Sequence, residues 1–342
     1  MSVKSRAVLT VLLAFCLGVY GAPKRKKAKP NQKATAAKVQ TPPPVNATAV
    51  NNNATADEVK ADSAGSAVAR AQILLDRAHY SPGEIDGHYG DNLQTAVRGY
   101  QAAHQLPVTG NVSADTWRLL NADSAPALVP YMIAPDDVAG PFEPIPTDMP
   151  DKAKLKALGF TSPQEALGER FHIDPKLLAE LNPGKDLSKA GEEILVPNVQ
   201  REFLLPADRV VVSKAQRTVT ALGADGRILA QYPATIGSEH DPLPIGDWKV
   251  KLVQQNPWYN YNPALFYDAD ASDTKARIAP GPNNPVGAVW IGLTKEHYGI
   301  HGTPEPGTVG HTTSHGCIRL TNWDAKELSQ MVKTATPVIL QE

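Results

Sequence analysis

The chain has 342 residues, of which 42% are hydrophobic and 20% are charged, so it is long enough for two or three modest domains. Its formal net charge of -1 excludes a global basic field, and nothing in the charge balance points to nucleic acid or anionic lipid as a partner. Indications of function must therefore come from local patterns along the chain.

Residues 1–21 have the pattern of a secretory signal peptide. Two basic residues precede an apolar run, 7–20, and small residues before Ala22 suit cleavage. The run is shorter than the ~20 residues that a membrane span needs. We therefore predict export to the periplasm or cell wall, with cleavage and no transmembrane segment in the mature chain. Lipid attachment at Cys16 stays open as an alternative, although the bulky Phe15 disfavours it.

The cysteine count points to a reactive thiol. The chain has two cysteines, Cys16 and Cys317, and the first lies in the signal segment. After cleavage a single thiol would remain in a compartment where disulfides normally form. An unpaired cysteine in an exported protein indicates reactivity or an intermolecular bridge.

Residues 22–64 are rich in Ala, Lys, Asn, Pro and Thr and contain few large apolar residues. A segment of this composition cannot bury enough apolar surface to offset the entropy lost on ordering. We therefore predict a disordered linker that tethers the folded part of the chain.

Residues 65–121 show the spacing of three short helices. Apolar positions recur at helical intervals around Ile73 and Val97, and a turn-rich loop, 82–90, joins these two segments. The loop has the pattern Pro-Gly-x-Ile-Asp-Gly-x-x-Gly and resembles that of the peptidoglycan-binding domain 1 family. This resemblance implies wall binding, although the loop glycines and the aspartate fit a purely structural role equally well.

Residues 122–150 are rich in Pro and Asp and are predicted to form a second linker. The next unit, 151–199, shows a helix, a turn, a second helix, a loop and a closing strand at 193–197. That order resembles a LysM module, a family that binds N-acetylglucosamine polymers. The usual opening strand is missing from the pattern and 159–162 stands in its place, so sugar binding stays open. His172 is interpreted as a surface or packing residue.

From about residue 203 the pattern changes to short β-prone runs separated by turns. Such a series predicts a mostly β sandwich or barrel at 208–341, closed by one late helix from Trp323 to about Val332. The predicted fold class is therefore multi-domain, with a small three-helix bundle, a small α+β module and this mostly β domain. The β-prone runs are 209–213, 218–222, 228–232, 248–252 and 288–293.

Two short motifs, 301–303 and 314–319, carry the chemistry of the mostly β domain. A free cysteine has a pKa of about 8.5 and is a nucleophile only as thiolate, so it needs a base or cation nearby. An imidazole can take the thiol proton and later return it to a leaving amine. Gly316, directly before Cys317, lets the backbone turn and leaves amide N–H groups open toward an oxyanion. The pattern indicates an acyl-transfer site.

Region 208–341 resembles the catalytic domain of the L,D-transpeptidases, the YkuD family. The match rests on the two motifs together with Gly310, Asn322 and the loops at 241–246 and 282–287. This resemblance implies cleavage of an L-to-D amide in a peptidoglycan stem tetrapeptide, with a thioacyl-enzyme and transfer of the acyl group to an amine. It implies no cofactor and no metal.

The same resemblance implies roles for single residues. Cys317 is the expected nucleophile, and His301 is the expected general base and acid, with its ring oriented by the Gly302 carbonyl. His315, Gly316 and the Cys317 N–H would shape the oxyanion site. The expected substrate-binding residues, of which the arginine would hold the loop or a substrate carboxylate, are Arg319, Ser314 and Thr303.

Two further features of this region affect the interpretation. The interval of thirteen positions between His301 and Ser314 is short for the family, and we interpret it as variation. Residues 256–277 are unusually aromatic. They fit either a lid over the stem peptide or ordinary packing of a long insertion, and the lid is favoured.

A zinc site is the main alternative from another chemistry. His301, His311, His315 and Cys317 are acceptable zinc ligands. No carboxylate stands in a His-Glu-x-x-His arrangement, however, and the family that the region resembles uses no metal. We therefore expect no metal at this site.

Two other functions stay open at the cell wall. With water as acceptor, the same thiol chemistry would make an L,D-carboxypeptidase. A non-catalytic wall-binding scaffold is also conceivable, but the retention of both His301 and Cys317 disfavours it. In each case the expected partner is peptidoglycan, through its stem peptides and glycan strands. A lysine of an envelope protein stays open as the acceptor.

Overall fold

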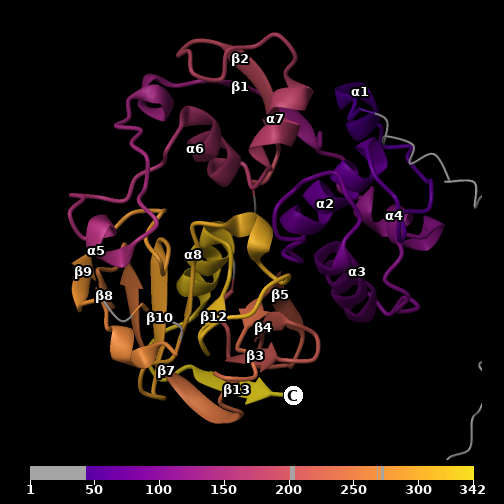
Figure 1. Ribbon diagram of the computed structural model, residues 1–342. Coiled ribbons are helices and arrows are strands. Elements are labelled where there is room, and N and C mark those ends of the chain that lie inside the picture. Colours follow the sequence, from indigo (N-terminus) through magenta and orange to yellow (C-terminus); the bar gives the residue numbers. More distant parts are fainter. Residues whose placement is uncertain (1–43, 201–204, 268, 271–272) are drawn as a thin grey trace, which may run out of the picture. The chain divides into compact units, whose positions relative to one another are not determined.

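The computed structural model describes residues 44–200, 205–267, 269–270 and 273–342 (Figure 1). The predicted signal peptide, Cys16 and the first half of the predicted linker lie outside these residues. No helix in the described part of the chain is long and apolar enough to cross a membrane. All described residues belong to one compact unit, Pro42–Glu342.

The helical bundle predicted for 65–121 is confirmed in the described part of the chain. Its helices pack around a core that includes Leu75 and Trp117. Ser113 begins the last helix by accepting a hydrogen bond from the Thr116 N–H, as a helix-capping serine does. The helices are α2 (Ser66–Arg77), α3 (Asp91–Ala103) and α4 (Ala114–Leu120).

The segment before this bundle is more ordered than its composition suggests. It contains α1 (Ala47–Val50), and Val59 forms a β-bridge to the loop before α4. Both Val50 and Val59 are fully buried, and the buried guanidinium of Arg70 donates to the Val50 carbonyl at 2.9 Å. The prediction of a disordered linker is therefore wrong for 44–64. The buried Val50 and Val59 and the hydrogen bond from Arg70 order this segment, and the average composition of the segment does not reveal such single contacts.

The next module is a small α+β unit in which β1 pairs antiparallel with β2, with Leu128 opposite Pro197. The prediction that 122–150 is only a linker is wrong, because β1 lies within it. This strand precedes the helices of the module and pairs with its closing strand. Its partner lies far along the chain, so local composition does not reveal the pairing. The elements of the module are β1 (Leu128–Met132), η1 (Pro135–Val138), α6 (Pro163–Arg170), α7 (Pro175–Leu181) and β2 (Glu193–Pro197), while α5 (Met149–Lys152) packs on residues of the C-terminal domain, Tyr261 and Ile278 among them.

Among the described residues, the C-terminal domain is built on a nine-stranded sheet with the order β5-β4-β3-β13-β7-β10-β11-β12-β6. Neighbouring strands are antiparallel except for the pairs β13–β3 and β11–β12, which are parallel. The mostly β fold and the late helix α8 (Asn322–Met331) are therefore confirmed. The strands are β3 (Arg209–Ser213), β4 (Thr218–Leu222), β5 (Ile228–Pro233), β6 (Thr235–Ile236), β7 (Gly246–Gln255), β10 (Val289–Leu293), β11 (Gly299–His301), β12 (Ile318–Arg319) and β13 (Pro337–Gln341).

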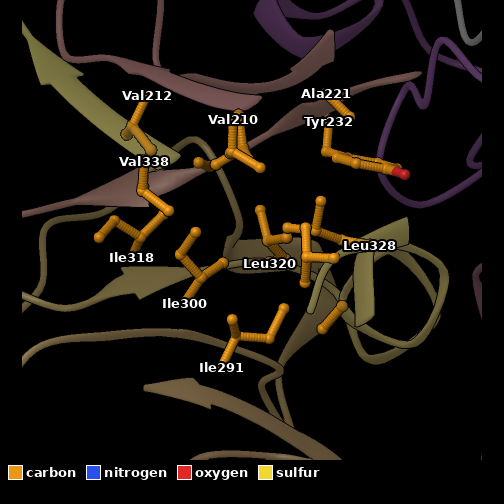
Figure 2. Packing of buried hydrophobic residues seen from close by; sticks show 14 of the residues in the cluster. Val210, Val212, Ala221, Tyr232, Ile291, Ile300, Ile318, Leu320, Leu328 and Val338 are labelled. Atoms are coloured by element: carbon orange, nitrogen blue, oxygen red, sulfur yellow. The ribbon is translucent and has the colours of Figure 1, made fainter. Parts of the chain in front are cut away.

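The core of this domain lies between the sheet and α8. Figure 2 shows Ile300 and Ile318 pointing toward the same apolar cluster as Leu320 and Leu328. Ile300 is 1% exposed and Ile318 is fully buried, and burying one such side chain contributes about 1.5–3 kcal/mol. Since these two isoleucines directly neighbour His301 and Cys317 in sequence, core packing fixes the backbone on which both motifs stand.

Backbone hydrogen bonds join the modules of this unit. The Gln231 N–H in β5 donates to the His79 carbonyl at 2.8 Å, and the Ser81 N–H donates to the Gln231 carbonyl at 2.9 Å. In the following loop, the Ile85 N–H donates to the His172 carbonyl at 2.8 Å. Ile85 is fully buried. The loop for which the sequence implies wall binding therefore packs against other parts of the same chain.

Candidate active site

His301 and Cys317 lie on neighbouring strands. His301 ends β11, and Cys317 directly precedes β12. The two strands are parallel, with Ile300 opposite Ile318 and His301 opposite Arg319. The Leu320 N–H donates to the His301 carbonyl at 2.8 Å and continues this pairing. The fold thus brings together the two motifs that are separated by a loop in the sequence.

The imidazole of His301 is buried, with 3% of the residue exposed. Its Nδ1 lies 2.7 Å from the Gly302 carbonyl, so Nδ1–H donates and Nε2 keeps its lone pair. The ring of Trp290 stacks on the imidazole at 5.4 Å between ring centroids. Burial, together with the nearby positive charge of Arg319, lowers the pKa of His301 to about 3, although the hydrogen bond to Gly302 opposes this shift. The imidazole is therefore neutral at physiological pH.

Cys317 is a free, half-buried thiol. Its Sγ lies 3.6 Å from the carbonyl oxygen of His297. Burial raises the pKa of the thiol, while a hydrogen bond from the Gly299 backbone and the charge of Arg319 oppose the rise. At rest the site therefore holds a neutral thiol and a neutral imidazole in two paired segments of the sheet. Such a pair produces thiolate only when the proton moves to the imidazole.

Close backbone packing shapes the loop that carries the cysteine. Gly316 has φ +97°, and a Cβ there would lie 2.8 Å from the ring of Tyr298. The Ser314 hydroxyl is buried and donates to the Cys317 carbonyl at 2.5 Å. Both features fix the turn in front of the thiol, and the requirement for glycine is steric as well as conformational.

A side chain of α8 fixes the start of the same loop. A Cβ at Gly302 would lie 2.1 Å from the Oδ1 of Asn322, and that oxygen accepts a hydrogen bond from the Ala288 N–H at 2.8 Å. Asn322 is fully buried. The sequence motif includes this asparagine without giving it a role. Together with Trp290, which stacks on His301, it packs against the 301–303 motif.

The predicted site residues divide into two groups. The pairing of β11 with β12 brings His301, Cys317 and Arg319 together, and the charge of Arg319 affects the pKa of the other two. Ser314 and Thr303 are buried, and Thr303 accepts a hydrogen bond from the Glu305 N–H at 3.3 Å. Both therefore make contacts within the loop itself.

Aromatic side chains of the 256–277 segment lie against the site. The ring of Phe266 lies 5.0 Å from that of His315, and Tyr267 lies 5.4 Å from the same imidazole, between ring centroids. Burial raises the pKa of Tyr259, and the negative charge of a Cys317 thiolate would raise it further. These contacts support a lid rather than remote packing. The segment contains β8 (Tyr259–Tyr261), η2 (Pro263–Leu265) and β9 (Ala276–Ile278).

No group of three or more His, Cys, Asp or Glu side chains in the described part of the chain could hold a metal ion. His311, a possible ligand from the sequence, lies instead with its Nε2 3.5 Å from the Asn92 Nδ2. A separate cavity of about 1290 Å³ lies between α6, α8 and the 136–160 segment. Its described lining residues include no candidate site residue.

Known proteins share the pattern of this domain. Residues 207–340 match the family model described as "L,D-transpeptidase catalytic domain", and residues 64–120 match that described as "Putative peptidoglycan binding domain". Over 176 residues the chain is 30% identical to "Putative L,D-transpeptidase YkuD" of Bacillus licheniformis, covering 51% of this chain and 90% of that protein. It is 29% identical to "Probable L,D-transpeptidase YbiS" of Escherichia coli, covering 53% of this chain and 60% of that protein.

Solved structures of similar proteins were also found. A crystal structure of an L,D-transpeptidase from Xylanimonas cellulosilytica is 17% identical, with a TM-score of 0.36, and covers 84% of this chain and 98% of its own. L,D-transpeptidase 3 from Mycobacterium tuberculosis is 20% identical, with a TM-score of 0.33, and covers 45% of this chain and 76% of its own.

Proposed function

This chain belongs to the L,D-transpeptidase family, and from that premise we propose that it cross-links or modifies peptidoglycan through a thioacyl-enzyme on Cys317. The observation that carries the proposal is the strand pairing that sets His301 beside the Cys317 turn, with Nε2 unprotonated. In this arrangement the imidazole can accept the thiol proton at the moment of attack.

The first half-reaction makes the thioester. The Cys317 sulfur attacks the carbonyl carbon of the L-to-D amide in a stem tetrapeptide while its proton passes to His301. The resulting oxyanion would be stabilised by backbone N–H groups at Gly316 and Cys317, in the turn that a positive φ opens. When the tetrahedral intermediate collapses, the C–N bond breaks and His301 returns the proton to the leaving amine.

The second half-reaction consumes the thioester. An acceptor amine attacks the carbonyl carbon and His301 takes the amine proton. The C–S bond then breaks, and the proton passes from His301 to the Cys317 sulfur. Either the side-chain amine of a second stem peptide or a lysine of an envelope protein fits this step. With water as acceptor the product would be a free tripeptide carboxylate.

Ser314 and Thr303, expected to bind substrate, are better placed to support the loop. Each is at most 5% exposed, and each hydroxyl hydrogen-bonds to loop backbone. Arg319 is only half-buried, and its charge acts on His301 and Cys317. It remains the proposed partner for a substrate carboxylate. His315, in contact with the aromatic lid, would form the wall between oxyanion and lid.

The substrate class follows from both family matches. A peptidoglycan-binding family model covers the helical module, and the transpeptidase model covers the mostly β domain. We therefore propose peptidoglycan as the substrate, and the signal-like N-terminus supports export to the periplasm or cell wall. The α+β module, with its LysM-like order, would add a second contact to the glycan strands.

The test is intact-mass spectrometry of the mature protein incubated with a tetrapeptide-stem disaccharide in EDTA, with and without an amine acceptor. We expect a thioacyl adduct on Cys317 and a cross-linked product when the amine is present. Cys317→Ala and His301→Asn should form no adduct, whereas the exposed His297→Asn should react as the parent does. An adduct that releases only tripeptide would identify a carboxypeptidase, and the absence of any adduct would favour a wall-binding scaffold.

A further inference from the structure

Residues of the C-terminal domain itself hydrogen-bond to the loop between His301 and Cys317. The Arg217 guanidinium donates to the Gly310 carbonyl at 2.7 Å, and the Gly310 N–H donates to the Thr235 hydroxyl at 3.0 Å. The Thr235 hydroxyl lies 3.3 Å from the Thr308 carbonyl. These bonds fix the middle of the loop against Thr235 of β6 and against Arg217, which directly precedes β4.

A residue of the helical module holds the same segment of the loop. The Asn92 side-chain amide, in the first turn of α3, donates to the Val309 carbonyl at 2.9 Å. Gly310 has φ +81°, and a Cβ there would lie 2.1 Å from the Asn92 Oδ1. Val309 is 1% exposed. The contact is therefore a hydrogen bond combined with packing that only glycine permits.

The helical module presents Asn92 from a fixed position. The Gln231 side-chain amide, in β5, donates to the Thr95 carbonyl of α3 at 3.1 Å. Gly99 in the same helix meets Gln231 so closely that a Cβ would lie 2.4 Å from its Oε1. Together with the backbone bonds between Gln231 and residues 79–81, these contacts dock α3 on the edge strand of the sheet. The contact of Asn92 with the loop is thus one of several contacts between the helical module and the C-terminal domain.

We propose that Asn92 is a positioning residue for Cys317, and that the helical module is thereby a working part of the acyl-transfer site. This inference rests on the proposed function of Cys317. Asn92 holds the loop segment 308–310 from the helical module, and Arg217 and Thr235 hold it from the C-terminal domain. The loop then delivers Gly316 and Cys317 in the geometry that attack requires. A misplacement of about 1 Å in such a turn can reduce the rate of the chemical step by up to about a hundredfold.

The first experiment compares Asn92→Ala with Asn111→Ala in the full-length mature protein. Asn111 is an asparagine of the same module whose side-chain amide donates to Glu58, away from the loop. We expect Asn92→Ala to lower kcat about tenfold and to change KM less than about twofold, because the chemical step is affected and substrate binding is not. Hydrogen exchange at 308–316 should accelerate in this variant alone.

The second experiment approaches the contact from the loop. Gly310→Ala places a methyl group where Asn92 lies, so it should reduce kcat strongly in the parent. In the Asn92→Ala background the space is open, and the loss caused by Gly310→Ala should be smaller by about threefold or more. The strain of a positive φ at position 310 is present in both backgrounds and cancels in the comparison.

Several outcomes would overturn the inference. These are equal kcat values for Asn92→Ala and Asn111→Ala, unchanged exchange at 308–316, or strictly additive effects of the two substitutions. Failure of the proposed function would look different, since the parent itself would then form no adduct on Cys317. In that event, exchange at 308–316 and the rate of Cys317 alkylation by iodoacetamide still report whether Asn92 holds the loop.

Discussion

The surroundings of His301 keep its imidazole neutral, which is the form that can act as a base. Its Nδ1–H is bound to the Gly302 carbonyl, and its ring lies under Trp290 in a buried position. Burial and the charge of Arg319 together lower its pKa to about 3. The Cys317 thiol has a raised pKa for the same main reason, burial. In the proposed mechanism the thiolate therefore arises by proton transfer between two neutral groups, and not from a permanent ion pair.

The low pKa of His301 has a consequence for stability. The folded protein holds this imidazole neutral down to pH about 3, whereas the unfolded chain binds the proton below about 6.5. The stabilisation is therefore complete above pH 6.5 and is lost as the pH falls toward 3. At about 1.4 kcal/mol per pKa unit this residue contributes at most about 5 kcal/mol to the change in unfolding free energy.

Urea unfolding between pH 7 and pH 4 measures this effect. The unfolding free energy of His301→Asn should depend less steeply on pH than that of the parent, whatever its absolute value. His297→Asn is the matched control, because the His297 side chain is 61% exposed, and it should keep the parent's slope. Equal slopes for all three proteins would show that His301 titrates in the folded protein as it does in the unfolded chain, which contradicts the lowered pKa.

At the scale of elements, the aromatic hairpin over the site offers a second test. Phe266 and Tyr267 face His315, while Trp258 lies over Arg277 at 4.1 Å from the guanidinium carbon to the ring centroid. The first two would cover a bound stem peptide, and the third would not. The hairpin therefore contains both the test residues and their control.

We expect Phe266→Ala combined with Tyr267→Ala to raise KM for the tetrapeptide substrate about tenfold. Loss of two ring contacts corresponds to about 1–2 kcal/mol of binding free energy, while the motif that performs the chemistry is unchanged. Steady-state kinetics with a soluble stem peptide measures the effect. Trp258→Ala should leave KM close to the parent value. A similar increase from Trp258→Ala would mean that the hairpin acts only through its fold.

The elements also show what local sequence could and could not reveal. The β-prone runs and the periodicity around Ile73 and Val97 predict the strands and helices, because each pattern is decided within a few residues. The β1 strand at 128–132 escapes this reasoning, since only pairing with the distant β2 makes it a strand. The same holds for 44–64, where Val50 and Val59 are ordered by a bundle that follows them.

The candidate site follows the same division. His301, Gly316 and Cys317 could be predicted as candidates because each belongs to a short contiguous motif. Asn92 and Trp290 could not be predicted, because their partners, Val309 and His301, are not indicated by the sequence around them. Burial that shifts the pKa of His301 is likewise a tertiary property. Residue types and their spacing in the sequence identify the groups that can react. The protonation state of each group in the resting protein depends on how it is packed in the fold.

At the scale of the whole described unit, buried polar contacts join the modules. The His79 Nδ1 lies 2.6 Å from the Glu327 Oε1, and the Ser81 hydroxyl donates to the Asp324 Oδ2 at 2.9 Å. His79 belongs to the helical module, and both carboxylates belong to α8. Glu327 is 9% exposed and Asp324 is fully buried. Unfolding of one module would remove the partner of a buried carboxylate in the other module. Such contacts therefore couple the stability of the two modules.

The described unit should therefore unfold as one cooperative block, and weakening the junction should divide it. His79→Asn removes the imidazole from Glu327, and asparagine tolerates the positive φ of 66° at this position. We expect a loss of about 2–3 kcal/mol in unfolding free energy. Denaturant-dependent hydrogen exchange should show α3 opening before β10 in this variant, whereas both open together in the parent.

His88→Asn is the control for this division, because His88 is an exposed histidine of the same module. It should keep the common opening of α3 and β10. Separate opening in the parent would mean that the helical module is held only loosely. Asn92 could then not grip the catalytic loop for the duration of a turnover. Cooperative unfolding and the positioning of Cys317 thus depend on the same docking of α3 against β5, and a loss of one should be accompanied by a loss of the other.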